Sequence, residues 1–155
     1  MKICMIGTGY VGLVSGTCFA DIGHQVYCVD KDLSKINQLN SGISPIYEPG
    51  LDELIKKNHK AKRLYFTSDL KKAITVSDII FICVGTPNIK GSLKVDLSSV
   101  FKCTKEILAI TKKKKIIVTK STVPIGTGDQ IENIIKKKKK LFSVISNPEF
   151  LREGE

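Results

Sequence analysis

The sequence predicts an α/β fold, a doubly wound parallel sheet of about six strands with helices on both faces. The first observation is that short apolar runs alternate with helix-like segments along the chain. The second is a glycine-rich turn between the first apolar run and the first helix-like segment. The third is that polar or glycine-containing turns follow several of the expected strands. A chain of 155 residues is long enough for one domain and too short for two of ordinary size.

The strands are placed on short apolar runs rich in β-branched residues, a composition typical of strands that are buried on both faces. They cover Lys2–Ile6, Gln25–Asp30, Arg63–Thr67, Ile79–Val84, Lys115–Thr119 and Phe142–Ser146. Because helix-like segments separate these runs, we expect neighbouring strands to be parallel.

The segments between the strands predict six helices. They cover Val11–Ile22, Leu33–Asn40, Gly50–Asn58, Leu70–Thr75, Leu97–Thr111 and Thr127–Lys137. Three of these helices are preceded by an aspartate, namely Asp32, Asp69 or Asp96. A short carboxylate at that position accepts hydrogen bonds from the free N–H groups of the first turn, so we expect these aspartates to be N-caps.

The first strand and the first helix are joined by Gly7-Thr8-Gly9-Tyr10-Val11-Gly12, a G-x-G-x-x-G pattern. In such a turn one glycine allows the tight bend, one allows the backbone to approach a pyrophosphate, and one allows close packing of helix and strand. The phosphate is then bound by the free N–H groups at the helix N-terminus. With both flanks in place, the pattern predicts a Rossmann-type dinucleotide site rather than a plain strand-to-helix turn.

The second strand ends in Asp30, close to the separation from the glycine pattern at which a carboxylate receives the adenosine ribose. A carboxylate at this position would repel a 2′-phosphate, so Asp30 favours NAD over NADP as the cofactor.

Three later turns also follow strand ends. They are Gly85-Thr86-Pro87, Ser121-Thr122-Val123-Pro124 and Asn147-Pro148-Glu149-Phe150-Leu151. The carboxyl ends of parallel strands share the edge of the sheet at which open α/β folds bind ligands, so we expect these turns beside the cofactor. Glu149 and Glu153 could then act as a general base or position a water.

Each of these turns also has a plainer interpretation. The first could be only the opening of a loop. Ser121 and Thr122 could make the hydroxyl-to-backbone bonds that are common in turns. Glu149 and Glu153 are four residues apart and could form a solvated acidic face of a helix.

Composition and charge argue against several classes of site. The five cysteines lack any zinc-like spacing, so we expect reduced core residues and no metal site. The net charge of +10 is concentrated in Lys112–Lys115 and Lys136–Lys140, which we interpret as solvated helix ends and not as a nucleic-acid surface. No apolar run approaches the length of a bilayer span, and Met1 and Lys2 enter the first strand directly. We therefore expect no membrane segment and a cytoplasmic protein.

Five motifs together resemble those of the UDP-glucose/GDP-mannose dehydrogenase family. They are Gly7-x-Gly9-Tyr10-Val11-Gly12-Leu13, Pro45-Ile46-Tyr47-Glu48-Pro49-Gly50-Leu51, Val84-Gly85-Thr86-Pro87, Lys120-Ser121-Thr122-Val123-Pro124-Ile125-Gly126-Thr127 and Asn147-Pro148-Glu149-Phe150-Leu151-Arg152-Glu153-Gly154. The resemblance runs in register from residue 1 to residue 155 and is strongest to members that oxidise UDP-glucose. It implies that residues 1–155 form an NAD-binding domain. It also implies an NAD-dependent oxidation of UDP-glucose to UDP-glucuronate, with successive hydride transfers and thiohemiacetal and thioester intermediates.

The resemblance also implies roles for individual residues. Cofactor contacts are implied for Gly7, Gly9, Tyr10, Val11, Gly12, Asp30, Lys35, Thr86, Pro87, Ser121, Thr122 and Glu153. Thr122 matches a threonine that helps to organise the catalytic water, and Glu149 matches a general acid–base glutamate. Glu149, Phe150, Leu151 and Glu153 match positions that contact the substrate. Thr122, Glu149 and Glu153 are thus the implied catalytic residues.

In the family, the nucleophilic cysteine and the lysine and asparagine that stabilise the oxyanion lie on a second domain that binds the sugar nucleotide. Dimers of the family form largely through a long helix beyond the NAD-binding domain. This chain ends at Glu155, before all of these features. We therefore expect the chain alone to bind NAD without turning over a UDP-sugar, and the contacts of a homo-oligomer to lie mostly outside it.

Two other interpretations remain open at this point. One is a relative that oxidises GDP-mannose or a UDP-N-acetylhexosamine, because the amino-terminal motifs are shared among such enzymes. The other is a stand-alone NAD-binding module without catalysis.

Overall fold

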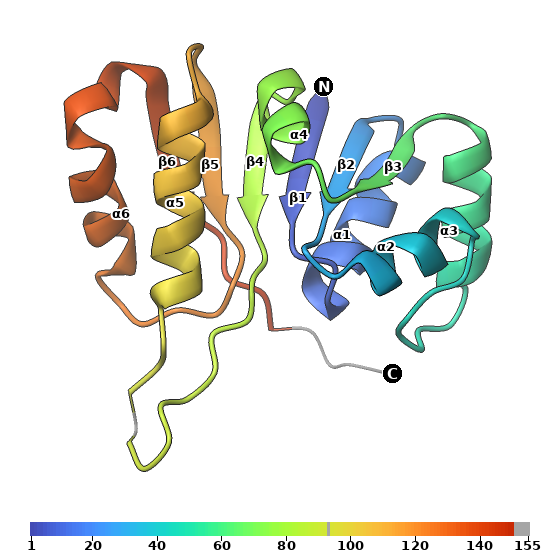
Figure 1. Ribbon diagram of the computed structural model, residues 1–155, viewed down its shortest axis with the longest axis horizontal. Helices are drawn as coiled ribbons and strands as arrows, with labels where there is room; N and C mark the ends of the chain where they lie inside the picture. The colour runs from blue at the N-terminus through green and yellow to red at the C-terminus, as the bar shows by residue number, and fades with distance from the viewer. Residues whose placement is uncertain (93, 151–155) are drawn as a thin grey trace.

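The computed structural model describes residues 1–92 and 94–150, in which six parallel strands form one sheet (Figure 1). The strands are β1 (Lys2–Ile6), β2 (Gln25–Val29), β3 (Leu64–Thr67), β4 (Ile79–Ile82), β5 (Lys115–Thr119) and β6 (Phe142–Ser146). Their order in the sheet is β3-β2-β1-β4-β5-β6. The order reverses between β1 and β4, which is the point at which doubly wound sheets bind their ligands. The predicted fold class is confirmed.

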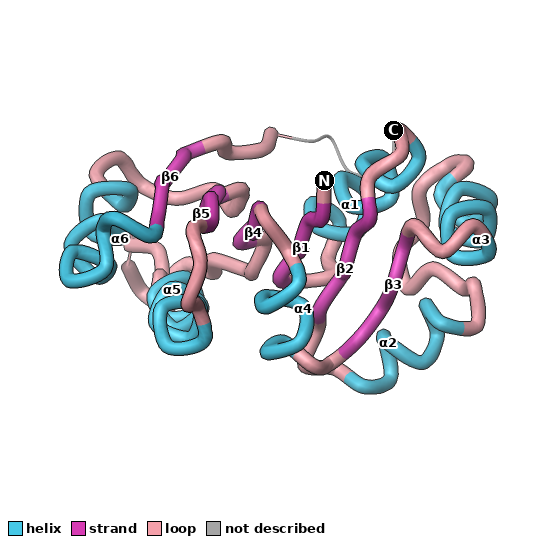
Figure 2. Tube along the Cα trace, turned by 90° about the horizontal axis from the view of Figure 1, so that it is seen from above, coloured by secondary structure: helices cyan, strands magenta, loops and turns pink. Residues whose placement is uncertain are grey.

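Helices cover the two faces of the sheet, as the view from above shows (Figure 2). They are α1 (Tyr10–Asp21), α2 (Leu33–Asn40), α3 (Leu51–Lys60), α4 (Leu70–Val76), α5 (Ser98–Ile110) and α6 (Thr127–Ile135), followed by the 3₁₀ segment η1 (Lys136–Leu141). Ile3 and Met5 of β1 pack in one core cluster with α1, α2 and α3, whereas Cys4 and Ile6 pack in a second cluster with α4, α5 and α6. This alternation follows from the period of two along a strand.

The predicted boundaries of the strands and helices agree with the structure to within two residues. Of the three aspartates that were expected to be N-caps, two have that role. Asp32 and Asp69 are the N-caps of α2 and α4, and each carboxylate accepts from N–H groups of the first turn. The prediction was wrong for Asp96, because α5 begins one residue later and its N-cap is Leu97. The Asp96 carboxylate nevertheless accepts from the Ser98 N–H at 2.8 Å, so it satisfies a free donor from one position further out.

The two lysine runs match their interpretation except at one residue. Lys112–Lys114 follow α5, and Lys136–Lys140 lie in η1 after α6. Lys115 instead begins β5 and is buried, with its Nζ donating to the carbonyl oxygens of Thr75, at 3.2 Å, and Ser77. These carbonyls end α4 and need donors, so the solvated interpretation was wrong for this lysine.

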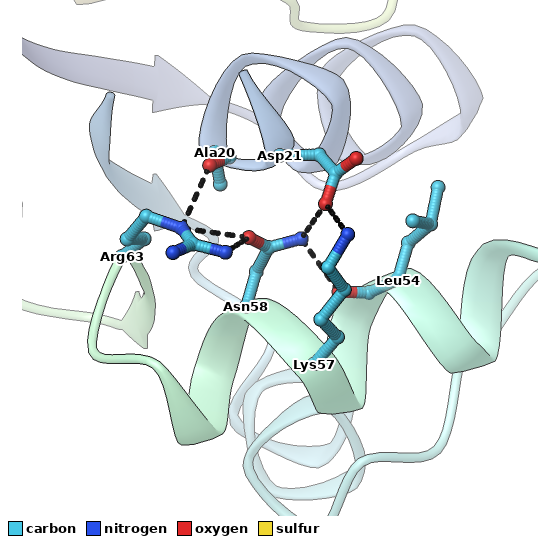
Figure 3. Close-up of polar contacts among 6 residues, drawn as sticks. All are labelled: Ala20, Asp21, Leu54, Lys57, Asn58 and Arg63. Atoms are coloured by element: carbon cyan, nitrogen blue, oxygen red, sulfur yellow. Dashed lines mark hydrogen bonds and ion pairs between the residues drawn. The ribbon is translucent and has the colours of Figure 1, made fainter. Parts of the chain in front are cut away.

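A polar cluster joins the end of α1 to α3 and to the start of β3 (Figure 3). Its centre is Asn58, which is fully buried. The Asn58 amide donates to Asp21 Oδ1 at 3.0 Å and accepts from Arg63 Nε and Nη2 at 3.0 and 2.9 Å. Lys57 completes the cluster with an ion pair to Asp21 at 2.7 Å. These bonds hold α3 against the C-terminal end of α1, the helix that follows the glycine turn.

Candidate functional site

The glycine turn after β1 leaves no room for a side chain at two of its positions. Gly7 has φ +107°, and a Cβ there would lie 2.5 Å from the carbonyl oxygen of Cys83. A Cβ at Gly12 would lie 2.0 Å from the carbonyl oxygen of Gly7. The Gly7 N–H also donates to Val29 O at 2.8 Å, so the turn is fixed against the end of β2. The fold of the turn, and not only a bound ligand, therefore requires glycine at positions 7 and 12.

Gly9 differs, because a Cβ at this position would have no protein atom within 4 Å. Gly9 is the N-cap of α1 and provides no side-chain cap for the free N–H groups of the first turn. Its bare backbone faces open space at the positive end of the helix dipole, which is what a pyrophosphate requires. Close packing of helix and sheet involves a glycine outside the pattern, Gly16, where a Cβ would lie 2.8 Å from Cys28 Sγ.

Asp30 lies directly after β2 and binds the glycine turn through one of its oxygens. Its Oδ2 accepts from the Thr8 N–H at 2.9 Å and the Thr8 hydroxyl at 2.8 Å, while its Oδ1 accepts from the Asp32 N–H at 3.0 Å. Partial burial raises the pKa of Asp30, but these hydrogen bonds, with help from nearby Lys35, outweigh it and hold the pKa below its usual range. Asp30 is therefore ionised at neutral pH. Among the described contacts, Oδ1 keeps a lone pair for a ribose hydroxyl.

Thr8 is a site residue that the sequence interpretation missed. It is fully buried, and both of its donors bind Asp30. It stands at an unspecified position of the glycine pattern, 22 residues from Asp30, and no local signal links the two.

A cleft of about 500 Å³ lies at this switch point. Its lining includes Gly7, Gly9, Asp30 and Lys35 as predicted, together with Gly85 after β4. The opposite wall comes from α5, through Ser99, Lys102, Cys103 and Glu106. This wall was also missed, although the spacing of these four residues places them on one face of a helix. The size, the bare turn and the ionised Asp30 fit a dinucleotide.

Hydroxyl-to-backbone hydrogen bonds, as in the plainer interpretation of these turns, join the turn after β4 to the turn after β5. The Ser121 hydroxyl is buried and donates to Val84 O at 2.7 Å. The Thr86 hydroxyl donates to Thr122 O at 2.9 Å. Asp96 N–H donates to Pro87 O at 2.8 Å, which closes the loop that leads into α5. These bonds hold the predicted residues in one cluster next to Val84 and Gly85, which line the cleft.

Glu149 joins this cluster from the segment after β6. Thr122 Oγ1 donates to Glu149 O at 3.2 Å, and the Lys120 ammonium binds the Glu149 carboxylate. The hydrogen bond from Lys120 lowers the pKa of Glu149 below its ordinary value. Glu149 is thus an ionised carboxylate paired with a lysine, and Thr122 contacts its backbone oxygen. The solvated-face interpretation also involves Glu153, which lies outside the described residues.

The remaining predicted residues lie as follows. Tyr10 begins α1, and its hydroxyl donates to Tyr47 O at 3.4 Å. Val11 packs against the core cluster of α1. Phe150 is exposed, and its N–H donates to Glu149 Oε1 at 3.1 Å. Leu151 and Glu153 lie outside the described residues.

The cysteines are free thiols, and Cys4, Cys28, Cys83 and Cys103 are buried as expected for core residues. Cys18 is exposed, so the core interpretation was wrong for it. Cys83 lines the cleft, where burial raises its pKa to about 12, so it is a neutral thiol at physiological pH. Among the described residues, no group of His, Cys, Asp and Glu could hold a metal ion, and no helix is both long and apolar enough to cross a membrane.

Known proteins resemble this chain in sequence over nearly its whole length. UDP-glucose 6-dehydrogenase of Rhizobium meliloti is 56% identical over 99% of the chain, and TuaD of Bacillus subtilis, with the same activity in its name, is 54% identical over 99%. The alignments cover 36% and 34% of those two proteins. The chain thus spans about a third of the length of the curated relatives it matches.

Solved structures resemble it in fold. A GDP-mannose dehydrogenase from Pseudomonas aeruginosa superposes with a TM-score of 0.92 at 39% identity, over 99% of this chain and 37% of that one. A UDP-glucose dehydrogenase from Pyrobaculum islandicum gives a TM-score of 0.89 at 36% identity, over 98% of this chain and 36% of that one.

The sequence also matches the model of the UDP-glucose/GDP-mannose dehydrogenase family, NAD binding domain, over residues 1–155. The description of that domain and the named relatives identify the cofactor as NAD, which the turn at Gly9 and the carboxylate of Asp30 fit. The chain belongs to the UDP-glucose/GDP-mannose dehydrogenase family.

Proposed function

We propose that this chain supplies the cofactor half of an NAD-dependent oxidation of UDP-glucose to UDP-glucuronate. The observation that carries the proposal is that Thr122 and Glu149 meet at the carboxyl edge of the sheet, next to the dinucleotide cleft. The names of the relatives at 56% and 54% identity support UDP-glucose as the substrate.

The residues of the cleft hold the cofactor in this proposal. The bare backbone at Gly9 and the N-terminus of α1 bind the pyrophosphate, and Asp30 accepts a ribose hydroxyl. Lys35 also lines the cleft and interacts electrostatically with Asp30. When bound, NAD supplies the hydride acceptor. Thr86 and Pro87, with Ser121 and Thr122, line the nicotinamide side.

Thr122 and Glu149 handle protons and water in this proposal. An ionised carboxylate accepts a proton from a hydroxyl group or a water, which a protonated carboxyl cannot do. The Thr122 hydroxyl donates to the Glu149 backbone, so its oxygen keeps acceptor capacity toward a water. Leu151 and Glu153 keep the substrate and catalytic roles implied by the resemblance as part of the proposal.

The chain's own cysteines do not supply the nucleophile in this scheme. Cys83 lies on the cleft, but it is a buried neutral thiol at physiological pH. We therefore keep the prediction that the isolated chain binds NAD without producing UDP-glucuronate.

GDP-mannose is the second candidate substrate, because a GDP-mannose dehydrogenase superposes on this chain with a TM-score of 0.92. The sequence identity to that enzyme, 39%, is lower than the 56% to the UDP-glucose enzyme. This difference favours UDP-glucose.

The experiment measures NADH formation by the whole polypeptide that the reading frame encodes, with UDP-glucose, GDP-mannose and UDP-N-acetylglucosamine offered in parallel. We expect UDP-glucose to give a kcat/KM at least about tenfold above the other two, a difference of about 1.4 kcal/mol. Faster turnover of GDP-mannose would transfer the proposal to the second candidate. NADH formation by residues 1–155 alone would contradict the prediction that the isolated chain binds NAD without turnover.

The predicted homo-oligomer and the cytoplasmic location belong to the same proposal. Light scattering of the whole polypeptide tests the first, and fractionation of the native cells tests the second. A monomer, or recovery with the membranes, would count against the respective prediction.

A further inference from the structure

A buried lysine stands beside the candidate base, and the proposed function assigns it no role. Lys120 follows β5 and is 7% exposed. Its Nζ binds the Glu149 carboxylate and lies 3.4 Å from Asn147 Oδ1. A buried ammonium is costly without a counter-charge, and Glu149 provides it.

The backbone around Lys120 is fixed from β4. The N–H groups of Lys120 and Ser121 both donate to Ile82 O, at 2.9 and 3.1 Å. Two successive donors on one carbonyl end the regular ladder between β4 and β5. The backbone of Lys120 is therefore fixed at the end of these two strands.

Glu149 is held in the same way from β5. The Asn147 N–H donates to Thr119 O at 2.9 Å, which continues the pairing of β6. The Thr122 hydroxyl binds Glu149 O, and the Phe150 N–H binds Glu149 Oε1. Lys120 binds the other oxygen, Oε2, so both carboxylate oxygens are fixed.

In the part of the chain that the structure describes, the titratable groups that face Glu149 come from two neighbouring elements. Lys120 approaches from the end of β5, and the Cys83 thiol, after β4, interacts electrostatically with both Lys120 and Glu149. Cys83 stays neutral across the physiological range because burial raises its pKa to about 12. Within residues 1–92 and 94–150, the charge that acts on Glu149 is thus that of Lys120.

We propose that Lys120 is a positioning residue for the reaction given under Proposed function, on which this inference rests. Its ammonium keeps the Glu149 carboxylate ionised and in one place beside Thr122. Without the ammonium, a partly buried carboxylate binds its proton more tightly and loses one of its two anchors. Lys120 therefore extends the working range of the base toward lower pH.

The first arm of the test uses the chain without substrate. Carboxyl ¹³C shifts of Glu149 are followed by NMR through a pH titration in the native chain and in Lys120→Met. We expect the pKa of Glu149 to rise by about one unit or more in the variant, a tenfold tighter binding of the proton. An unchanged titration of Glu149 in a folded variant would overturn the proposal. If Lys120→Met does not fold, the pKa of Glu149 is measured in Lys120→Gln, which keeps an amide donor without the charge and is expected to show the same rise.

Lys139→Met is the matched control, because Lys139 forms a 3.3 Å ion pair with Glu132 on the exposed surface. This pair is exposed and is separated from Glu149 in the chain by β6, so we expect Glu149 in Lys139→Met to titrate as in the native chain. A rise in the pKa of Glu149 in Lys139→Met as large as in Lys120→Met would mean that the loss of any positive charge has this effect, and it would overturn the proposal.

The second arm measures the pH dependence of kcat/KM in the whole polypeptide, because kcat/KM reports the groups of the free enzyme, which is the state titrated in the first arm. In Lys120→Met the acid limb is expected at higher pH by the same amount as the titration, because a base with a raised pKa is protonated sooner on acidification. Lys120→Arg is expected to restore the native limb. A loss of kcat/KM with no movement of the limb would assign Lys120 a structural role only. Absence of turnover in the native polypeptide counts against the proposed function, while the titration still decides the role of Lys120.

Discussion

Gly9 and Gly12 belong to one pattern, but the structure gives them different tasks at the scale of single residues. A side chain at Gly12 would collide with the backbone of Gly7, whereas a side chain at Gly9 would meet no protein atom within 4 Å. Gly9 also has φ −78°, which alanine adopts without strain. Binding and folding can therefore be separated within a single turn.

Gly9→Ala is predicted to lower NAD affinity at least about tenfold, or 1.4 kcal/mol, because the new methyl group occupies the space that the pyrophosphate needs. Its free energy of unfolding should change by less than about 1 kcal/mol. Gly12→Ala should lower that free energy by about 1–3 kcal/mol, because the backbone has to move. Urea denaturation and calorimetric NAD titration measure both quantities. Equal losses of stability in the two variants would contradict the separation.

The residues that sequence reasoning missed at this scale are those with no local pattern. Asp30 was predictable because it ends an apolar strand at a known separation from the glycines. Thr8 binds Asp30 through two hydrogen bonds, and Lys120 binds Glu149 through an ion pair; both partners lie far along the chain. Such pairs depend on the strand register and on side-chain rotamers, which the sequence pattern does not specify.

At the scale of elements, helix α1 is fixed at both ends. Its N-terminus follows the glycine turn, and its C-terminal residue Asp21 binds Asn58 of α3 (Figure 3). The sequence predicted both helices from the segments that separate the apolar strands. It could not predict the buried Asn58, because a polar residue in a short amphipathic helix is normally exposed.

Asn58→Ala is predicted to lower the free energy of unfolding by about 2–3 kcal/mol, because it removes the buried amide that forms hydrogen bonds with the charged groups of Arg63 and Asp21. Lys57→Met is the control, since it removes only the half-exposed ion pair to Asp21 and should cost less than about 1 kcal/mol. Urea denaturation at neutral pH measures both. A cost for Lys57→Met equal to that for Asn58→Ala would show that the ion pair, and not the buried amide, holds α1 to α3.

At the scale of the whole molecule, the topology could be predicted well and the site only in outline. Parallel strands joined by helices bring all of their carboxyl ends to one edge, so the meeting of the turns after β1, β4, β5 and β6 follows from the order of elements alone. The wall of the cleft formed by α5 does not follow from it, because it depends on the angle at which that helix packs. The cleft thus lies between the two halves of the sheet.

Because the cleft has walls from both halves, NAD is predicted to stabilise the whole chain against heat. A ligand at 100 times its Kd adds about 2.7 kcal/mol to the free energy of unfolding. For a chain of this length that corresponds to a rise in Tm of about 5–10 °C. NADP at the same concentration should give a smaller rise, because the ionised Asp30 repels a 2′-phosphate, and Gly9→Ala should reduce the rise with NAD. Scanning calorimetry with each nucleotide measures these shifts. A larger rise with NADP would refute the assignment of Asp30, and an undiminished rise in Gly9→Ala would refute the contact of the pyrophosphate with the glycine turn.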